Sequence, residues 1–428
     1  MFDQCKALIV GLQKRGAVVG SSLNTAYLLE RLSQTLERLE TLMAIFVSNR
    51  YLPRRILLLT GCFARAAAER HSISRLWKQS SGLMARSVTQ NAGDHGEHYI
   101  TRDKKEYWAM FYSAAGGGVL IALMALFKTY LGSIIDDKVW KGIAEGLNYG
   151  LGFMVIFMLH FTVATKQPAM TAARFAEAVE KTPQGKTVNM KLAQLLVDVF
   201  RSQSIAVLGN VLIAMGLAAL IAFGYQYKTG EPLMNADQIA YQLHSIDPFA
   251  GTLWFAAIAG VWLFCSGIIS GYFDNRSNYL NMRMRLTQHP LLKKLMSEKT
   301  RVKFANYMHE NYGSLIGNLC FGMLLGITGV VGYLTHLPLD IRHVAFSSAN
   351  VGYIAVSGQF TYSLLLQCIS FVLLIGLVNL IVSFSLTLWV ALRSLNAEID
   401  SWWPIWHEVC QIVKKRPLSL FLPIQLDK

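Results

Sequence analysis

Six stretches of the chain run for roughly 20 residues or more with almost no charged side chain, which is the length that a helix needs to cross the hydrocarbon core of a bilayer. They cover residues 109–127, 142–165, 205–225, 250–273, 314–334 and 363–390. Lipid offers the backbone no hydrogen-bond partner, so each stretch is expected to be a helix that satisfies its own polar groups. The pattern therefore predicts an all-α, polytopic membrane protein with six transmembrane helices.

Two of these stretches are similar to each other in sequence. Residues 207–225 align without a gap to residues 315–333, and the alignment pairs Gly209-Asn210 with Gly317-Asn318. A fainter third copy begins at Gly117, in the first stretch. These similarities predict three helical hairpins related by parallel repetition, an arrangement that occurs in transport proteins.

The basic residues alternate along the chain in a way that predicts its orientation. Lysine and arginine number 16 before the first stretch, then 3, 6, 1, 8 and 1 in the five connections, and 5 in the tail. Basic residues gather on the cytoplasmic side of membrane proteins. The alternation therefore places both termini in the cytoplasm, and we expect a bacterial inner-membrane protein in contact with membrane lipids.

Composition agrees with this interpretation. Hydrophobic residues make up 53% of the chain and charged residues 15%, against about 25% charged in an ordinary soluble domain. The net charge of +14 is explained by the cytoplasmic segments and requires no nucleic acid. The six cysteines include no Cys-x-x-Cys pair, so no zinc ribbon or disulfide framework is predicted.

The parts outside the spans are expected to be helical too. Residues 1–108 form a predicted cytoplasmic helical region, residues 109–390 the transmembrane domain, and residues 391–428 a cytoplasmic tail. Within residues 29–46, apolar side chains recur at alternating steps of three and four, which is the spacing of a coiled-coil seam. We expect this seam to pack on the next helix, to bind a helical partner, or to self-associate. The connection at residues 337–360 is apolar but interrupted by charges and glycines, which favours an interfacial or re-entrant segment.

Polar residues in and beside the spans gather at their predicted cytoplasmic ends. Buried polar groups at membrane depth are costly and point to function. We expect a cytoplasm-facing pocket that binds or moves an anionic amphiphile or solute, with His160 as a candidate proton carrier. The alternative is that the asparagines bond neighbouring helices together and the charges reach the interface. The candidate ligand-binding residues are His160, Lys166, Gln167, Asn210, Asp274, Asn275, Arg276, Asn318 and Arg393.

No motif assigns a cofactor, a metal or a catalytic residue. Asp94-His95-Gly-Glu97-His98 gathers four possible ligands, but no second cluster in the sequence completes a tetrahedral site. No glycine-rich phosphate loop, nucleophile elbow or His-Glu-x-x-His motif occurs.

Two segments carry a resemblance to a known family. They are residues 20–32, Gly-Ser-Ser-Leu-Asn-Thr-Ala-Tyr-Leu-Leu-Glu-Arg-Leu, and the segment from His160, His-Phe-Thr-Val-Ala-Thr-Lys-Gln-Pro-Ala-Met-Thr. The chain resembles the bacterial site-specific recombinase transmembrane proteins, the gonococcal crossover recombinase-like group. Members of that group are longer, so this chain is expected to correspond to their C-terminal portion. The resemblance implies a role with DNA as the alternative to solute binding, and a membrane scaffold is the third hypothesis.

The sequence does not match the catalytic patterns of the known recombinases. A tyrosine recombinase places its catalytic histidine and arginine as His-x-x-Arg, whereas His71 and Arg75 are separated by three residues. A serine recombinase carries its nucleophile on an α/β sheet, whereas Ser21 and Ser22 precede a predicted helix. No catalytic set is therefore assigned.

Overall fold

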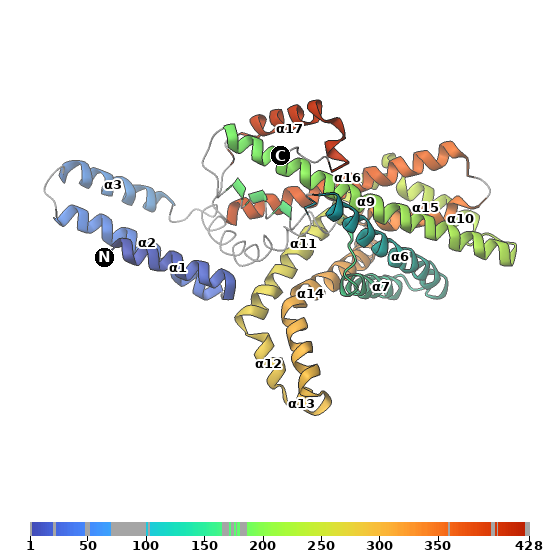
Figure 1. Cartoon of the computed structure of the whole chain (residues 1–428), viewed down its shortest axis with the longest axis horizontal. Coiled ribbons are helices and arrows are strands. Elements are labelled where there is room, and N and C mark those ends of the chain that lie inside the picture. The colour runs from blue at the N-terminus through green and yellow to red at the C-terminus, as the bar shows by residue number, and fades with distance from the viewer. Residues whose placement is uncertain are drawn as a thin grey trace. The chain divides into compact units, whose positions relative to one another are not determined.

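The computed structural model describes residues 2–19, 23–47, 52–69, 100–101, 103–164, 171–172, 175–176, 178–179, 186–357, 360–394, 399 and 401–423. These residues are helical or lie in turns and loops, and no strand occurs among them (Figure 1). The chain divides into two compact units. One comprises residues 1–91, 271–312 and 393–396, and the other comprises residues 92–270, 313–392 and 397–428.

The first unit contains three N-terminal helices, α1 (Phe2–Val19), α2 (Leu23–Val47) and α3 (Leu52–Glu69). Helix α1 lies against α2, and the Lys6 ammonium donates to the Glu40 carboxylate at 2.5 Å. The predicted seam lies on α2, where Leu32, Leu39 and Met43 are exposed. Its role in binding a partner stays a prediction.

The first unit also contains a basic hairpin formed by α12 (Met282–Gln288) and α13 (Pro290–Leu295), with the adjoining ends of α11 (Thr252–Tyr279) and α14 (Glu298–Thr335). The two long helices meet through the Ser277 hydroxyl, which lies 3.1 Å from Nδ1 of His309. The rings of Phe273 and Tyr312 also pack edge to face. These contacts hold the ends of α11 and α14 side by side within this unit.

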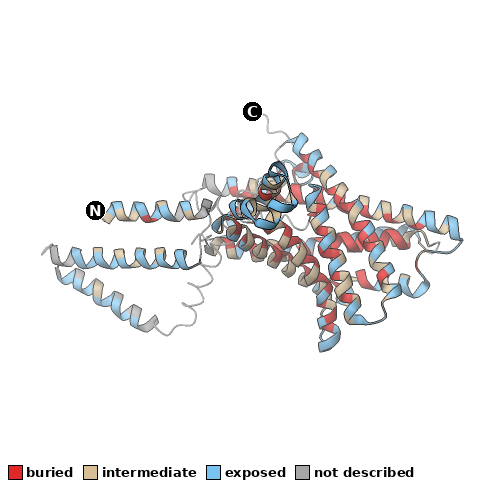
Figure 2. Cartoon of the chain, turned by 90° about the horizontal axis from the view of Figure 1, so that it is seen from below, coloured by how far each residue is buried: buried red, intermediate tan, exposed pale blue. Residues whose placement is uncertain are grey.

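The second unit contains most of the apolar helices. In chain order these are α6 (Lys104–Ile134), α7 (Lys138–Met158), α9 (Lys186–Thr229), α10 (Ala236–Ile246), the first part of α11, most of α14, α15 (Val344–Ala355) and α16 (Tyr362–Ser394). Helix α17 (Trp403–Lys415) follows and packs on α9. Buried residues run through the helices of this unit, whereas α1 to α3 are mainly exposed or half-buried (Figure 2).

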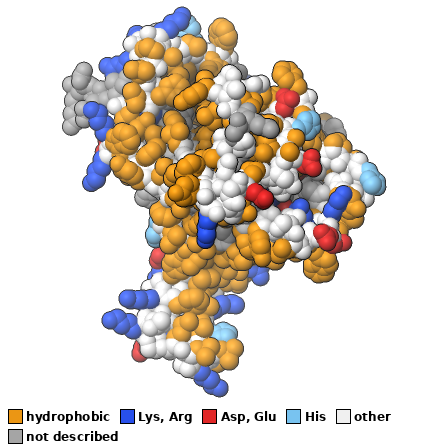
Figure 3. Space-filling model, turned by 90° about the vertical axis from the view of Figure 1, so that its right-hand side faces the viewer, with side chains coloured by type: hydrophobic (Ala, Val, Ile, Leu, Met, Phe, Trp, Pro, Cys, Tyr) orange, Lys and Arg blue, Asp and Glu red, His pale blue; other side chains and the backbone are white. Residues whose placement is uncertain are grey.

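Five helices of the described chain are long and apolar enough to cross a membrane. They are α6, residues 190–229 of α9, α11, α14 and α16. Hydrophobic side chains cover much of the surface in the view of Figure 3, as expected where lipid is the solvent. The coarse prediction of an all-helical protein with several apolar helices is thus confirmed.

The stretch 142–165, predicted as the second span, does not pass the same test. Its helix, α7, carries Lys141, Glu145 and Asn148, which lower its hydropathy, and it ends at Met158 rather than near residue 165. His160 adopts a left-handed conformation with φ 58°, and the Phe161 N–H bonds back to the Ile156 carbonyl. This hydrogen bond closes the helix in the manner of a Schellman motif. The predicted count of six spans, the parallel repetition, the domain limits and the positions of the termini stay predictions.

Glycines allow α7 and α14 to pack with their backbones in contact. A Cβ atom on Gly322 would overlap the Gly150 backbone, and one on Gly326 would overlap Gly146. Residues 150 and 146 therefore meet residues 322 and 326 in opposite order, so the two helices run antiparallel. Small residues at such spacing drive helix association in membranes, because lipid supplies no hydrophobic driving force between helices.

Helix α15 lies inside the second unit, against α9, and ten of its residues are buried. At 12 residues it is too short to cross a bilayer. The close approach is made at Gly352, where a Cβ would overlap the Met215 carbonyl on α9. The segment predicted as interfacial or re-entrant therefore contains a short buried helix, and its position relative to the membrane stays a prediction.

Candidate functional site

Asn210 is the predicted site residue whose surroundings the structure describes best. It is 1% exposed, and its amide nitrogen donates to the carbonyls of Ala114 and Thr162. Its amide oxygen accepts from the Ala164 N–H at 2.8 Å. All of these partners are backbone groups, so this side chain joins α9 to α6 and to the segment after α7.

His160 lies close to that joint through its backbone. Its side chain is exposed, and its carbonyl accepts a hydrogen bond from the Ser113 hydroxyl at 3.0 Å. Its left-handed conformation ends α7, as described above. Lys166 and Gln167, which follow it in the sequence, lie outside the described residues.

The remaining predicted residues occupy other places. Asn318 is 3% exposed and donates to the Ser314 carbonyl of its own helix. Asp274, Asn275 and Arg276 lie in the last turns of α11, and Arg276 donates to the Tyr272 hydroxyl at 3.2 Å. Arg393 lies in the last turn of α16. Within the second unit, hydrogen bonds bring Asn210 together with the segment that begins at His160. Asp274, Asn275, Arg276 and Arg393 all belong to the first unit.

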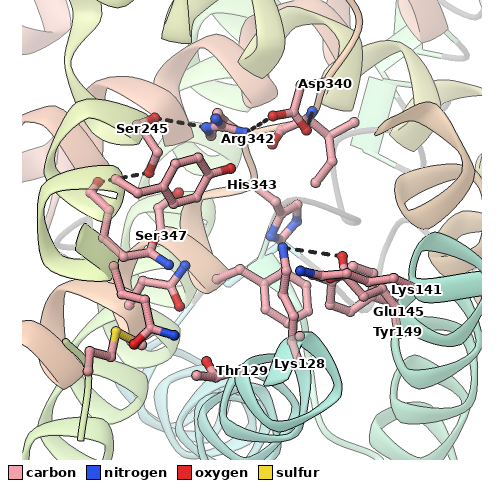
Figure 4. Close-up of a pocket in the computed structure, with 18 of the residues that line it drawn as sticks. Lys128, Thr129, Lys141, Glu145, Tyr149, Ser245, Asp340, Arg342, His343 and Ser347 are labelled. Carbon is pink, nitrogen blue, oxygen red and sulfur yellow. Dashed lines mark hydrogen bonds and ion pairs between the residues drawn. The ribbon is translucent and has the colours of Figure 1, made fainter. Parts of the chain in front are cut away.

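The second unit contains a polar pocket that includes none of the nine. It has a volume of about 470 Å³ and lies where α6 ends and α7 begins, beside α10 and the start of α15 (Figure 4). Its charged lining residues are Lys128, Lys141, Glu145, Asp237, Asp340 and Arg342.

The wall formed by α6 and α7 holds one ion pair. Nζ of Lys128 lies 3.5 Å from the Glu145 carboxylate, and 5.7 Å from the centre of the Tyr149 ring. Glu145 is 14% exposed and Lys128 is 39% exposed, so water reaches the pair and partly screens its charges. Lys141, one turn before Glu145, lines the pocket and has no ion pair within the described part of the chain.

The opposite wall is built around Arg342, which is tightly held. Its Nε donates to the Ser245 carbonyl at 2.8 Å, and its Nη1 donates to the Asp340 carboxylate at 2.6 Å and to the Ile341 carbonyl at 2.8 Å. The guanidinium also lies over the Phe255 ring. Three fixed acceptors orient the planar group, and Arg is suited to hold a carboxylate in this way.

A third wall comes from the start of α10. Asn235 caps this helix in a reciprocal capping box with Gln238, which ends the preceding loop and fixes the first turn. Asp237 lies in that turn, is exposed, and has no ion pair among the residues that the structure describes. The pocket therefore offers an acid without an ion-pair partner as well as the lysine described above.

His343 lies at the base of the pocket and is 1% exposed. The rings of Phe153, Phe321 and Phe346 surround it, with centroid distances of 6.3, 5.8 and 5.9 Å. Burial lowers the pKa of its imidazole to about 4, because an apolar environment disfavours the charged form. His343 is therefore neutral at pH 7 and adds no charge to the pocket.

Sequence reasoning missed this pocket because its residues lie at the ends of helices and in short connections. In the sequence, Lys128 and Lys141 stand out only as basic residues of a connection, and Arg342 only as a charge that interrupts an apolar segment. The signal that was present is the pair Asp340 and Arg342 in an otherwise apolar connection. The other signal is Glu145 inside an apolar stretch.

The described residues contain no group of three or more histidine, cysteine or acidic side chains that could hold a metal ion. The predicted ligand cluster at residues 94–98 lies outside them.

Comparison with known families identifies a matching family. A family model described as site-specific recombinase matches residues 1–423. No curated protein and no solved structure matches the chain.

Proposed function

The chain belongs to the site-specific recombinase family, and from that premise we propose that it is a multi-pass membrane protein that binds a small zwitterionic solute. The binding site is the pocket between α6, α7, α10 and the start of α15. The observation that supports this proposal is a pocket of mixed charge inside a bundle of apolar helices. Charged side chains in such surroundings are costly unless they are paired or bind something.

The charges of the pocket favour a zwitterion over the anion expected from the sequence. Lys128 is paired with Glu145, and Arg342 with Asp340. These two pairs cancel, which leaves Lys141 to attract a carboxylate and Asp237 to attract an ammonium group. The volume of about 470 Å³ lies in the usual range for small-molecule sites. A free amino acid or a short peptide has the required size and both charges.

The pocket faces away from the cytoplasm in this proposal. Its walls come from the connections 128–141, 226–249 and 335–362, which hold only 3, 1 and 1 basic residues. The positive-inside rule places such segments on the outer face of an inner membrane. The proposed site therefore lies on the side opposite to the pocket predicted from His160 and its neighbours.

The test is binding by the purified chain in detergent. The probes are dialanine, N-acetyl-alanine, which keeps only the negative charge, and alanine amide, which keeps only the positive charge. Dialanine is expected to raise the melting temperature and to show saturable binding by calorimetry, whereas the two singly charged analogues are not.

Two pocket variants and one control make the test specific. Lys141→Gln and Asp237→Asn should each weaken dialanine binding by roughly 10- to 100-fold, since each removes one charged hydrogen bond. Lys138→Gln removes a positive charge from the same helix as Lys141, but the Lys138 ammonium lies over the Tyr333 ring, 4.2 Å from its centre, and does not line the pocket. It should leave binding unchanged. Equal losses in all three variants, or tighter binding of either singly charged analogue, would reject the proposal.

A second candidate function is association with DNA, as the family description implies. The observation that favours it is the basic hairpin, since α12 and α13 carry Arg283, Arg285, Lys293 and Lys294. The full chain in detergent should then shift duplex DNA in a gel. The shift should weaken steeply as salt is added, because binding releases counterions from the DNA and this release is less favourable at high salt. Loss of the shift on replacing Arg283 and Arg285 by Gln would support this role, and absence of any shift at low salt would reject it.

A further inference from the structure

Two buried asparagines in the second unit each make three hydrogen bonds to backbone groups, and the two sets of partners are arranged in the same way. Asn210 on α9 donates to a carbonyl of α6, donates to the Thr162 carbonyl, and accepts from the N–H two residues later, at Ala164. Asn379 on α16 is 0% exposed. It donates to the Ala256 carbonyl of α11 at 2.7 Å and to the Arg342 carbonyl at 3.0 Å, and accepts from the N–H two residues later, at Val344. Each asparagine therefore pins two long helices to one connecting segment.

The likeness extends to the helices that accept these bonds. The α6 acceptor begins the sequence Ala114-Ala115-x-x-Gly118-Val119, and the α11 acceptor begins Ala256-Ala257-x-x-Gly260-Val261. A Cβ on Gly118 would meet the Asn210 carbonyl at 2.8 Å and Cβ of Ile213 at 3.2 Å. A Cβ on Gly260 would meet the Asn379 carbonyl at 3.1 Å and Cβ of Val382 at 2.8 Å. Each glycine thus lies one turn after the acceptor, against the asparagine and the residue three positions beyond it.

The helix between each pair also ends in the same way. Helix α7 lies between α6 and α9 in the chain, and α14 lies between α11 and α16. A histidine in the left-handed conformation follows each of them, His160 with φ 58° and His336 with φ 55°. Positive φ is rare outside glycine, so a histidine with this geometry at both places is a third point of agreement.

The two sets run in opposite directions. Helices α6 and α9 run toward the pocket, since Lys128 lies near the end of α6 and Met234 lies just after α9. Helix α11 begins beside the pocket, where the Phe255 carbonyl accepts from the Arg342 N–H at 3.2 Å, and runs away from it. Helix α16 is parallel to α11, because residue 379 lies against residue 256 and residue 382 against residue 260. The middle helices α7 and α14 are antiparallel and meet along their glycines.

We infer that these helices form an inverted repeat, with α6, α7 and α9 in one copy and α11, α14 and α16 in the other. On this basis we propose that the protein is a carrier whose pocket opens to the two sides of the membrane in turn. Two copies of one unit in opposite orientation can exchange conformations, which yields a second state that is the inverted image of the first. The proposal rests on the proposed function for the identity of the solute, but not for the alternation itself.

Access to the pocket from each side of the membrane tests the alternation. Thr129 lines the pocket, and Thr129→Cys would be made in a chain whose six native cysteines are replaced by serine. The variant is reconstituted in sealed vesicles, and a membrane-impermeant maleimide is supplied either outside or inside them. Ser133→Cys is the control, because Ser133 is exposed one turn later on the same helix and does not line the pocket.

The expected result is labelling of Thr129→Cys from both sides, with Ser133→Cys labelled from one side only in a population of fixed orientation. Labelling of Thr129→Cys from one side alone would overturn the carrier and would identify the repeat as a structural duplication. Dialanine binding separates the two proposals. If dialanine binds but labelling is one-sided, the solute site is supported and the carrier proposal is rejected. If labelling is two-sided but dialanine does not bind, the alternation is supported and the proposed solute is rejected.

Discussion

Replacement of Asn379 by leucine tests whether a buried amide holds the bundle together. Leucine has nearly the same volume, so the change removes the three hydrogen bonds with little change in packing. Hydrogen bonds between membrane helices contribute about 0.6 kcal/mol on average and about 1.7 at most. The Ala256 carbonyl keeps its place in a helix, but the Val344 N–H belongs to the first turn of α15, where no helical partner exists. Leaving a buried donor such as the Val344 N–H unpaired costs about 1–3 kcal/mol more. The free energy of unfolding is therefore expected to fall by about 2–4 kcal/mol.

Asn318→Leu is the matched control. Asn318 is also a buried asparagine of an apolar helix, but it donates to a carbonyl of its own helix, at Ser314. That carbonyl already accepts from the helical backbone, so removal of the Asn318 side-chain hydrogen bond should lower the free energy of unfolding by under about 1 kcal/mol. Asn210→Leu should match Asn379→Leu, because it removes the same set of bonds at the other end of the bundle.

The measurement is the free energy of unfolding in mixed detergent micelles, with far-ultraviolet circular dichroism as the signal that monitors the loss of helix. The order of stability should be parent, then Asn318→Leu, then the other two variants close together. If Asn318→Leu is as damaging as Asn379→Leu, bonding across helices is not what these residues provide. If Asn210→Leu and Asn379→Leu differ by more than about 2 kcal/mol, the equivalence of the two joints fails.

Three further outcomes follow from the structure. Gly322→Leu should lower the melting temperature strongly, because its side chain would enter the Gly150 backbone. Gly216→Leu should not lower it, because a Cβ there has nothing within 4 Å. Equal effects of the two variants would contradict the close packing of α7 on α14. Stability should fall as the pH drops from about 6.5 to about 4, by at most about 3 kcal/mol, because burial lowers the pKa of His343 to about 4 and the unfolded chain then binds the extra proton. His343→Leu should remove that part of the pH dependence, and an unchanged profile would refute the assignment. His160→Gly should raise stability by up to about 1 kcal/mol, since φ 58° suits glycine; loss of dialanine binding in this variant would instead show a role in the site.

The long apolar helices could be recognised from the sequence because their signal is local. Five of the six predicted stretches correspond to helices that are long and apolar enough to span a membrane, since length and hydropathy belong to one segment at a time. The stretch 142–165 falls below that hydropathy because Lys141 and Glu145 lie in α7, and a histidine ends the helix where no glycine or proline signalled it. Whether this stretch crosses the membrane stays a prediction. The family resemblance also depended on contiguous residues, and it was confirmed over residues 1–423.

The site and the repeat depended on contacts between distant segments. Asn210 and Asn318 occupy the same place in an aligned pair of stretches, yet one joins two helices to a connecting segment and the other bonds to its own helix. The true counterpart in hydrogen bonding, Asn379, shares little sequence around it because only the amide and the facing glycine are constrained. Sequence by itself determined which segments avoid water, since that preference is written in each side chain. Only the tertiary structure decided which polar groups face one another, because a buried amide or charge is stabilised by partners that the chain brings from far away.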